Sequence, residues 1–387
     1  MKILFADQFS EFGGAQRVLS EVLDEVVRRG WLAQVMAPGS GPLLAACTAR
    51  GIPALPLPFN RYSNGHKTAT DVFRYTIDSA RAMFAIRDAA RRFQPDLIYV
   101  NGPRVLPAAV LAARTLQTPI IFHTHSYLKR GYARSIADWC VKQENVRVVA
   151  ISRFVARPFD GAAGARTRII YNGVRDHGFL PCPRAKPQCI GIVGRVSPEK
   201  GHADFVSTAR IMAATRPGLR FVVFGAAQFS DSAFEREVRA AAGACVEFRG
   251  WADDVSPALH EIDVLAVPSG PGEGATRVIM EAFSAGTPVV AYPSGGIPEL
   301  VRHGDTGFLT CARGERHLAG GLGELLDDPA LMQRLSLNGR REWDTRFRLD
   351  RFQSEIRDFI AGAQTTSGFR CELPAPESAS GIARGAR

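Results

Sequence analysis

The chain contains no apolar stretch long enough to cross a bilayer. The best candidate, residues 105–113, stops after nine residues between Arg104 and Arg114, whereas a spanning helix needs about 20. The first residues, MKILFADQF, form a short apolar run that ends at Asp7 and lacks the longer apolar region of a signal peptide. The sequence therefore predicts a cytoplasmic protein that does not span a membrane.

Motifs for disulfides and metals are also missing. The seven cysteines are scattered and include no C-x-x-C pair, so they predict neither a disulfide framework nor a structural zinc site. His123 and His125 share one face of a strand because strand side chains alternate. No third ligand stands at a suitable spacing from them. We therefore predict no metal site and expect a single imidazole to contact a substrate.

Length and composition indicate two soluble globular domains. The chain has 387 residues, of which 46% are hydrophobic and 22% charged, and a domain commonly takes about 100 to 200 residues. Residues 1–187 hold 26 Lys and Arg against 13 Asp and Glu, a net charge of +13, whereas residues 188–387 have a net charge of −3. The basic half is expected either to meet an anionic partner or only to present a solubilising surface.

Short apolar strands alternate with amphipathic helices along the chain, which is typical of parallel sheets covered on both faces. The predicted strands are residues 2–7, 33–38, 96–101, 119–124, 146–151, 167–172, 189–194, 219–225, 245–250, 263–269, 287–292 and 306–310. The pattern predicts two Rossmann-like, doubly wound α/β domains around an interdomain cleft. We assign residues 1–178 and 189–345 to the domains, 179–188 to a linker, 346–363 to a last helical segment and 364–387 to a disordered tail.

Two glycine-containing loops follow predicted strands. Gly13 and Gly14 precede a helix, where they let a ligand approach the backbone and the free N–H groups of the helix terminus. Arg195 and Lys200 flank the turn of GRVSPEKG, where two cations can hold a pyrophosphate from two sides. The alternatives are an ordinary turn and two solvated loop cations.

Two carboxylates stand eight residues apart in EGATRVIME. Glu273 is expected before a helix and Glu281 about two turns inside it. Carboxylates accept hydrogen bonds from hydroxyls, so the two can hold two different sugars. The alternative is that Glu273 is a helix-terminal acid favoured by the dipole and that Glu281 is a surface residue.

The order of these segments resembles the family 4 retaining glycosyltransferases of the GT-B fold. The resemblance covers about residues 1–362 and is strongest over 189–309. Its carriers are GGAQRV, FHTH, IYNGV, VGRVSPEKG, FRGW, VPS, EGATRVIMEAFSAGTPVVA and SGGIPELVRHGDTGFL. The resemblance implies that the first domain binds the acceptor, that the second binds a nucleotide sugar, and that the last helix crosses back to the first domain.

The resemblance also implies how the donor nucleotide is held. Gly13 and Gly14 would approach the donor through their backbone, while Arg195 and Lys200 would neutralise the leaving pyrophosphate. Glu281 would accept hydrogen bonds from the ribose hydroxyls. Because fixed cations at the diphosphate replace a metal ion, and because no D-x-D stands in these motifs, the implied enzyme is metal-independent and uses no cofactor.

The transferred sugar has its own implied ligands. Glu273 would hold its hydroxyls near the reacting carbon, beside the backbone N–H groups of Gly274, Ala275 and Thr276. His123, rather than His125, matches the family histidine that contacts the donor sugar and its phosphate. Glu273 and His123 are therefore the catalytic candidates.

Two further residues are implied to border the nucleotide and its base: Gly225 and Trp251, the latter next to Gly250. Two positions depart from the family pattern. Gln16 stands where an acidic residue is common, and Arg277 where an apolar residue is usual. The departures leave open the contacts at the glycine turn and the choice of base.

The expected activity is sugar transfer to a lipid-linked or polysaccharide acceptor in cell-surface glycan biosynthesis. Residues 65–76 and 127–142 are expected to line the acceptor site, and the excess charge of the first half to attract an anionic membrane surface or a diphosphate-linked lipid, with the protein peripheral at the inner face. That charge includes Arg87, Arg91, Arg92, Lys129, Arg130 and Arg134. Alternatives are a sugar-nucleotide epimerase and an inactive sugar-nucleotide-binding paralogue. Nucleic-acid binding is not expected, because aromatic and basic residues do not interleave.

Overall fold

The computed structural model describes residues 1–60, 69–181, 189–228 and 232–363. Most of the predicted linker and the whole predicted tail lie outside the described residues. Within the described part of the chain, no helix is long and apolar enough to cross a membrane.

The first sheet is entirely parallel and has the strand order β3-β2-β1-β4-β5-β6-β7. Its strands are β1 (Lys2–Asp7), β2 (Leu32–Pro38), β3 (Ala54–Leu57), β4 (Leu97–Asn101), β5 (Ile120–Thr124), β6 (Val146–Ala150) and β7 (Thr167–Ile169). Its helices are α1 (Gly14–Arg28), α2 (Pro42–Ala49), α3 (Ala69–Phe93), α4 (Leu106–Arg114), α5 (Tyr132–Val141), α6 (Arg153–Ala156) and α7 (Asp160–Ala163). The sequence pattern missed β3, a four-residue edge strand that contains Pro56. A proline argues against a strand in a sequence pattern, because it is tolerated only at the edge of a sheet.

The second sheet is also parallel, with the order β10-β9-β8-β11-β12-β13. Its strands are β8 (Cys189–Val193), β9 (Arg220–Phe224), β10 (Glu247–Gly250), β11 (Val264–Val267), β12 (Val289–Ala291) and β13 (Phe308–Leu309). Its helices are α8 (His202–Ala213), α9 (Ser232–Ala242), α10 (Ser256–Glu261), α11 (Arg277–Ala285), α12 (Ile297–Leu300), α13 (Glu315–Asp327) and α14 (Pro329–Glu342). The two sheets confirm the predicted fold class.

Apolar periodicity explains how the helices pack on the sheets. On α1, Val18, Leu19, Val22 and Leu23 are completely buried against the strands, as the three-and-four spacing predicts. The same spacing predicts that Val27 is buried on this stripe, but Val27 is 50% exposed. This prediction is wrong because Val27 lies at the edge of the stripe, in the last turn of the helix.

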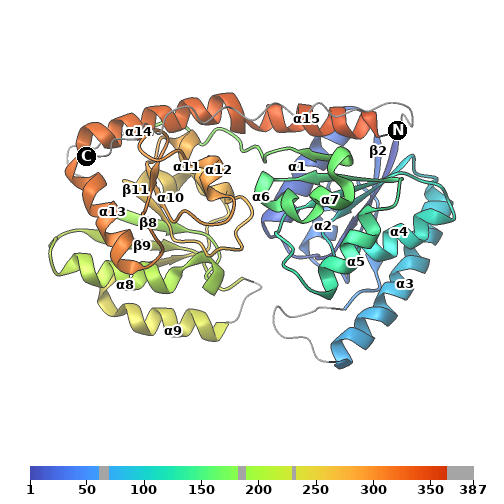
Figure 1. Ribbon diagram of the computed structural model, residues 1–387, viewed down its shortest axis with the longest axis horizontal. Helices are drawn as coiled ribbons and strands as arrows, with labels where there is room; N and C mark the ends of the chain where they lie inside the picture. The colour runs from blue at the N-terminus through green and yellow to red at the C-terminus, as the bar shows by residue number, and fades with distance from the viewer. Residues whose placement is uncertain (61–68, 182–188, 229–231, 364–387) are drawn as a thin grey trace, which may run out of the picture.

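The last helix, α15 (Leu349–Gly362), returns to the first sheet (Figure 1). Phe352, Ile356 and Ile360 are buried in the same core as the strands β1 and β2. Arg351 Nη2 donates to the carbonyl oxygen of Tyr171 at 2.6 Å. A π-helical segment, Trp343–Phe347, joins α15 to α14 on the second domain, so the end of the chain ties the two domains together.

The strand order places the candidate site. In each sheet the order reverses beside the first strand, between β1 and β4 and between β8 and β11. Ligands of such sheets bind beyond the carboxyl ends of the strands at this reversal. The glycine turn follows β1, the Arg195 loop follows β8, and Glu273 follows β11, so all three stand at the predicted position.

Candidate functional site

The carboxyl edges of the two sheets face each other. Ser152, after β6, donates from Oγ to the carbonyl oxygen of Gly274 at 2.8 Å. A Cβ added to Gly274 would lie 2.7 Å from the carbonyl oxygen of His125. Arg17 Nη1, on α1, donates to the carbonyl oxygen of Asp253 at 3.2 Å. Loops from both domains therefore meet where the sequence predicted a ligand.

Lys200 and Glu273 form an ion pair at this edge. Lys200 Nζ lies 2.6 Å from Glu273 Oε2, and their side chains are 26% and 14% exposed. Lys200 ends the short turn Pro198–Lys200, and Gly201 follows with φ +76°. A Cβ on Gly201 would lie 2.0 Å from the carbonyl oxygen of Pro268, so only glycine fits this turn. A ligand that carries phosphate oxygens and hydroxyls can exchange with this pair, taking one partner with each group.

Arg195 has a different carboxylate partner. Its Nη2 donates to Glu199 Oε1 at 2.5 Å within the same loop, and Arg195 is 33% exposed along its side chain. The two predicted cations therefore stand in one loop, each neutralised by its own acid.

Glu281 is not a surface residue. It is 8% exposed and lies 3.6 Å from Arg277 through Oε1 and Nε. Arg277 in turn donates from Nη2 to Glu21 Oε1 at 2.8 Å and from Nη1 to Glu21 Oε2 at 2.9 Å. The alternative assignment of Glu281 to the surface is therefore wrong, because the first domain covers this part of α11.

The histidine rings lie side by side, with centroids 4.1 Å apart, as strand alternation predicts. His123 is completely buried, and its Nδ1 lies 2.6 Å from the Tyr99 hydroxyl. His123 Nε2 has no hydrogen-bond partner among the described residues. Burial lowers the pKa of His123 well below its usual range, and the charge of a neighbouring histidine would lower it further. His125 is half-buried, and burial lowers its pKa to about 3, so burial favours the neutral form of both rings.

A buried hydrogen-bond chain, which sequence reasoning missed, connects the glycine turn to His125. Gln16 Oε1 accepts from Gly13 N at 3.2 Å, and Gln16 Nε2 donates to Asp7 Oδ1 at 2.9 Å. Asn101 Nδ2 donates to Asp7 Oδ2 at 2.5 Å, and Asn101 Oδ1 lies 2.7 Å from His125 Nε2. Burial raises the pKa of Asp7 to about 6, although these hydrogen bonds oppose the rise. The unusual glutamine was the available signal, because its amide can donate to a carboxylate where an acid would repel it.

Two glycines of the SGGIPE segment support the loop that carries Glu273. Gly296 N donates to the carbonyl oxygen of Glu273 at 2.9 Å. Cβ atoms on Gly295 and Gly296 would lie 2.1 and 1.9 Å from the carbonyl oxygens of Glu273 and Gly274. The backbone of the loop Glu273, Gly274, Ala275 and Thr276 thus packs directly against Gly295 and Gly296. It ends at the N-terminus of α11, where the first N–H groups have no intrahelical acceptor.

Gly225 and Trp251 directly follow the strands β9 and β10 of the second domain. A Cβ on Gly225 would lie 1.9 Å from the carbonyl oxygen of Gly194, so this glycine permits close approach of the ends of β8 and β9. Trp251 Nε1 donates to Asp253 Oδ1 at 3.0 Å. The Arg17 guanidinium lies 6.0 Å from the Trp251 ring centroid, so Trp251 borders the first domain.

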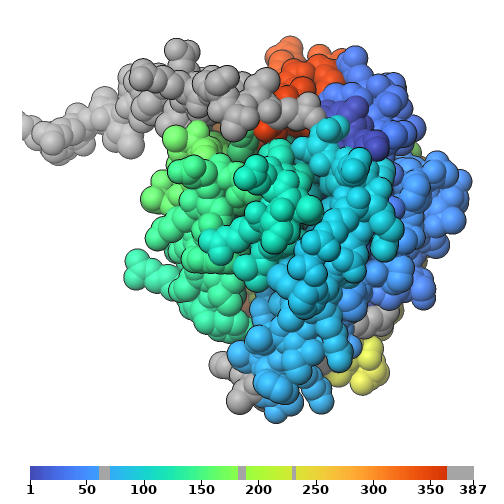
Figure 2. Space-filling model, turned by 90° about the vertical axis from the view of Figure 1, so that its right-hand side faces the viewer, coloured from blue at the N-terminus to red at the C-terminus, as the bar shows by residue number. Residues whose placement is uncertain are grey.

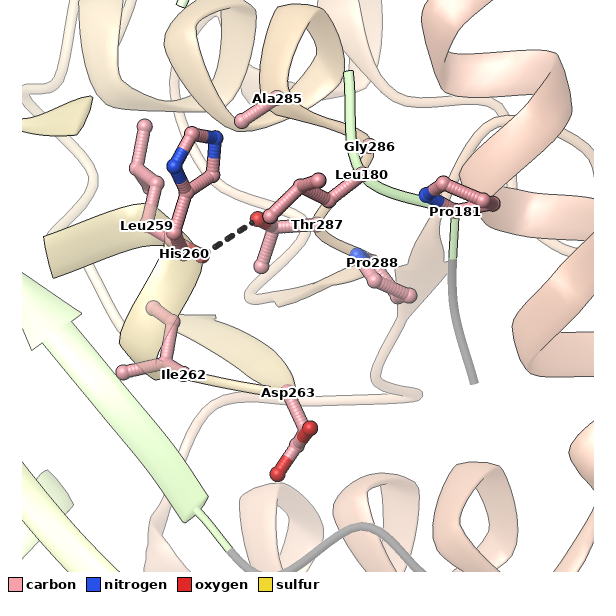
Figure 3. A pocket seen from close by; sticks show the side chains of 10 residues that line it. All are labelled: Leu180, Pro181, Leu259, His260, Ile262, Asp263, Ala285, Gly286, Thr287 and Pro288. Carbon is pink, nitrogen blue, oxygen red and sulfur yellow. Dashed lines mark hydrogen bonds between the residues drawn. The ribbon is translucent and has the colours of Figure 1, made fainter. Parts of the chain in front are cut away.

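A small pocket lies elsewhere on the second domain (Figure 3). Its lining includes Ile262 and Asp263 before β11, and Thr287 and Pro288 before β12. It therefore opens at the amino ends of these strands, on the edge opposite to Glu273. Within the described residues, no group of three or more His, Cys, Asp or Glu side chains is arranged to hold a metal ion.

Several curated proteins are similar to this chain in sequence. Glycogen synthase of Mycobacterium tuberculosis is 25% identical over 277 residues, which is 66% of each chain. The GDP-mannose-dependent alpha-(1-6)-phosphatidylinositol monomannoside mannosyltransferase of the same species is 29% identical over 56% of this chain and 61% of its own. The matches thus span about two thirds or less of these relatives. Phosphatidyl-myo-inositol mannosyltransferase of Mycobacterium leprae is 24% identical over 83% of this chain and 86% of its own.

Solved structures and family models agree with these matches. Anabaena HepE in complex with UDP superposes with a TM-score of 0.79 at 25% identity, over 94% of this chain and 100% of HepE. Sucrose-phosphate synthase of Thermosynechococcus elongatus shares the fold, with a TM-score of 0.75 at 17% identity over 94% of this chain and 99% of its own. The model described as Glycosyltransferase Family 4 matches residues 12–177, and the model described as Glycosyl transferases group 1 matches residues 187–328. The chain therefore belongs to the family 4 glycosyltransferases and has the GT-B fold.

Proposed function

We propose that this chain is a retaining glycosyltransferase that moves a sugar from a nucleotide sugar to a lipid-linked or polysaccharide acceptor in cell-surface glycan biosynthesis. The observation that carries the proposal is the Lys200–Glu273 ion pair at the carboxyl edge of the second sheet, 2.6 Å long and next to Gly274, which contacts the first domain. Cleavage of a nucleotide sugar develops positive charge on the sugar and negative charge on the diphosphate. A cation and a carboxylate side by side match these two charges.

The diphosphate would displace Glu273 from Lys200. Lys200 and Arg195 then neutralise the departing phosphates, and the backbone at Gly13, Gly14 and the α11 terminus donates hydrogen bonds to their oxygens. Because protein cations serve the diphosphate, the proposed reaction uses no metal ion and no cofactor. Glu273, once released, accepts hydrogen bonds from the hydroxyls of the transferred sugar.

The remaining site residues define the nucleotide and the reacting face. Glu281 accepts from the ribose, while Gly225 and Trp251 border the base. His123 would meet the donor through its Nε2, which is buried without a partner in the described part of the chain. The acceptor attacks the face of the sugar that the diphosphate leaves, and the phosphate takes the acceptor proton, so the anomeric configuration is retained.

The acceptor domain offers a surface suited to an anionic bilayer. Exposed apolar side chains on its outer helices include Phe73, Ile77 and Phe84 on α3, and Tyr132 and Trp139 on α5. Figure 2 faces this side of the molecule, with α3 toward the viewer. Residues 69–142 contain 11 Lys and Arg against five Asp and Glu. Aromatic side chains among basic residues insert into a headgroup layer while cations attract its phosphates, so we assign a peripheral location at the inner membrane face.

The membrane assignment is tested by flotation with vesicles. We expect binding to vesicles with 30% anionic lipid and weak binding to neutral vesicles, with loss of at least half the bound protein in Phe73→Ser/Phe84→Ser. Leu337→Ser, on the second domain and also exposed, serves as the control. Equal flotation with anionic and neutral vesicles would return the charge to a solubilising role.

The activity is tested with purified protein and a panel of nucleotide sugars, with release of nucleoside diphosphate and transfer to lipid-linked acceptors as readouts. Lys200→Met and Glu273→Gln should each lower kcat at least 100-fold, as loss of a group that stabilises transition-state charge does. Glu324→Gln, on α13, should leave kcat unchanged. Wild-type activity in both site variants would refute the proposal. Product NMR reports the anomeric configuration, and donor conversion without acceptor would indicate the epimerase instead.

A further inference from the structure

Arg277 is a largely buried cation between two carboxylates that belong to different domains. Glu21 lies on α1 of the first domain, whereas Arg277 and Glu281 lie in the first two turns of α11 in the second. The side chains of Arg277, Glu21 and Glu281 are 15%, 16% and 11% exposed. The three groups therefore interact in a poorly solvated boundary, where charge interactions are strong.

The two carboxylates use the guanidinium differently. Glu21 accepts hydrogen bonds from both terminal nitrogens of Arg277 in a bidentate pair, at 2.8 and 2.9 Å. Glu281 lies 3.6 Å from Nε, which is longer than a hydrogen bond, and Nε has no hydrogen-bond partner among the described residues. The positive charge of Arg277 thus attracts the Glu281 carboxylate, while the oxygens of Glu281 remain available to accept hydrogen bonds from another group.

The charges of the three groups also act on one another. Burial raises the pKa of Glu21, the charge and hydrogen bonds of Arg277 oppose the rise, and Glu281 adds to it. Without the cation, the two close carboxylates in this boundary would repel each other.

We propose that Arg277, oriented by Glu21, is a positioning residue for the donor: its charge attracts the Glu281 carboxylate, while its bidentate pair with Glu21 leaves the oxygens of Glu281 free to accept hydrogen bonds from the vicinal hydroxyls of the donor ribose. Ribose recognition in the second domain then depends on a carboxylate of the first. This inference rests on the proposed function, which assigns the ribose to Glu281. Glu21 itself acts through Arg277.

The experiment measures dissociation constants of UDP, GDP and ADP and of their 2′-deoxy forms by calorimetry. For the diphosphate that binds, the wild type should prefer the ribo form at least tenfold, because a site built for a hydroxyl rejects an analogue that lacks it. Arg277→Leu should abolish most of this preference. Glu21→Gln should reduce it at least threefold, because the released guanidinium turns to Glu281 and competes with the ribose.

Two further variants separate positioning from general damage. Arg277→Lys keeps the charge without the bidentate geometry and should give an intermediate preference. Glu21→Gln/Arg277→Leu removes both partners together and should be no worse than Arg277→Leu alone, since coupled residues are non-additive. The control is Asp24→Asn, on the same helix, whose side chain is 50% exposed and pairs with Arg50; its preference should stay within twofold of the wild type.

The outcomes distinguish this inference from the proposed function. A wild-type ribo preference that is unchanged in Glu21→Gln and Arg277→Leu overturns the inference and leaves the proposed function standing. If the wild type binds none of the three diphosphates, or shows no ribo preference, the ribose role of Glu281 fails and the inference fails with it. If Arg277→Leu does not fold, the isosteric Glu21→Gln decides: a retained preference overturns the inference and a reduced one supports it.

Discussion

The close contact between Gly296 and the loop that carries Glu273 allows a test of how precisely this loop must be placed. Gly296 has φ −87°, which any residue adopts, so Gly296→Ala introduces no backbone strain. Its new Cβ would lie 1.9 Å from the carbonyl oxygen of Gly274 and 3.1 Å from Ser152 Oγ. Since real Cβ contacts stay beyond about 3.0 Å, the Gly274 backbone must move by about 1.1 Å.

That displacement sets the expected magnitude. A shift of about 1 Å in a positioning group can lower the rate about 100-fold, which corresponds to about 2.7 kcal/mol of transition-state stabilisation. Overpacking of this kind also lowers the free energy of unfolding by about 1 to 3 kcal/mol. We therefore expect kcat/KM to fall about 100-fold, with a folded but less stable protein.

The matched control lies in the same loop. Gly272 is exposed, and a Cβ added there would meet no atom within 4 Å, so Gly272→Ala should keep kcat/KM within twofold. Transfer kinetics and thermal unfolding of both variants check the prediction. If Gly296→Ala folds and retains kcat/KM within threefold of the wild type, then the placement of Glu273 does not depend on this glycine contact and the reasoning is refuted.

Two other sites give further predictions. The pKa of Asp7 is raised from 3.8 to about 6 by burial, so its contribution to the free energy of unfolding is full below pH 4 and falls by about 3 kcal/mol as pH rises through 6. Asp7→Asn removes that slope and turns an amide toward the Gln16 and Asn101 donors; urea unfolding from pH 4 to 8 should show a flatter profile than the wild type, and parallel profiles would contradict the assignment. At the glycine turn, Gly14 is exposed and a Cβ there meets nothing within 4 Å, so Gly14→Ala should keep the thermal midpoint but raise the donor KM at least fivefold. A Cβ on Gly225 would lie 1.9 Å from the carbonyl oxygen of Gly194, so Gly225→Ala should instead lower the thermal midpoint by several degrees. The reverse ranking of the two variants in a melting experiment would show that the glycine roles are misassigned.

Local patterns in the sequence were sufficient for the architecture. Continuous apolar runs such as residues 97–100, all buried in β4, predict central parallel strands because both faces are covered. Since a parallel sheet brings the ends of its strands to one edge, the loops after β8 and β11 could be assigned to one edge of the second sheet, and the loop after β1 to the matching edge of the first sheet, before any contact was known. The edge strand β3 was missed because four residues with a proline carry too little periodicity.

The chemistry of the site depended on contacts that periodicity does not encode. The sequence by itself determined two α/β domains and the edges at which Lys200, Glu273 and Glu281 stand. Only the tertiary structure decided that Lys200 pairs with Glu273, and that Arg277 pairs with Glu21 on the other domain, 256 residues away. The physical reason is that a strand or helix follows from the spacing of its own residues, whereas a contact between loops of two domains depends on how both cores place their sheets against each other.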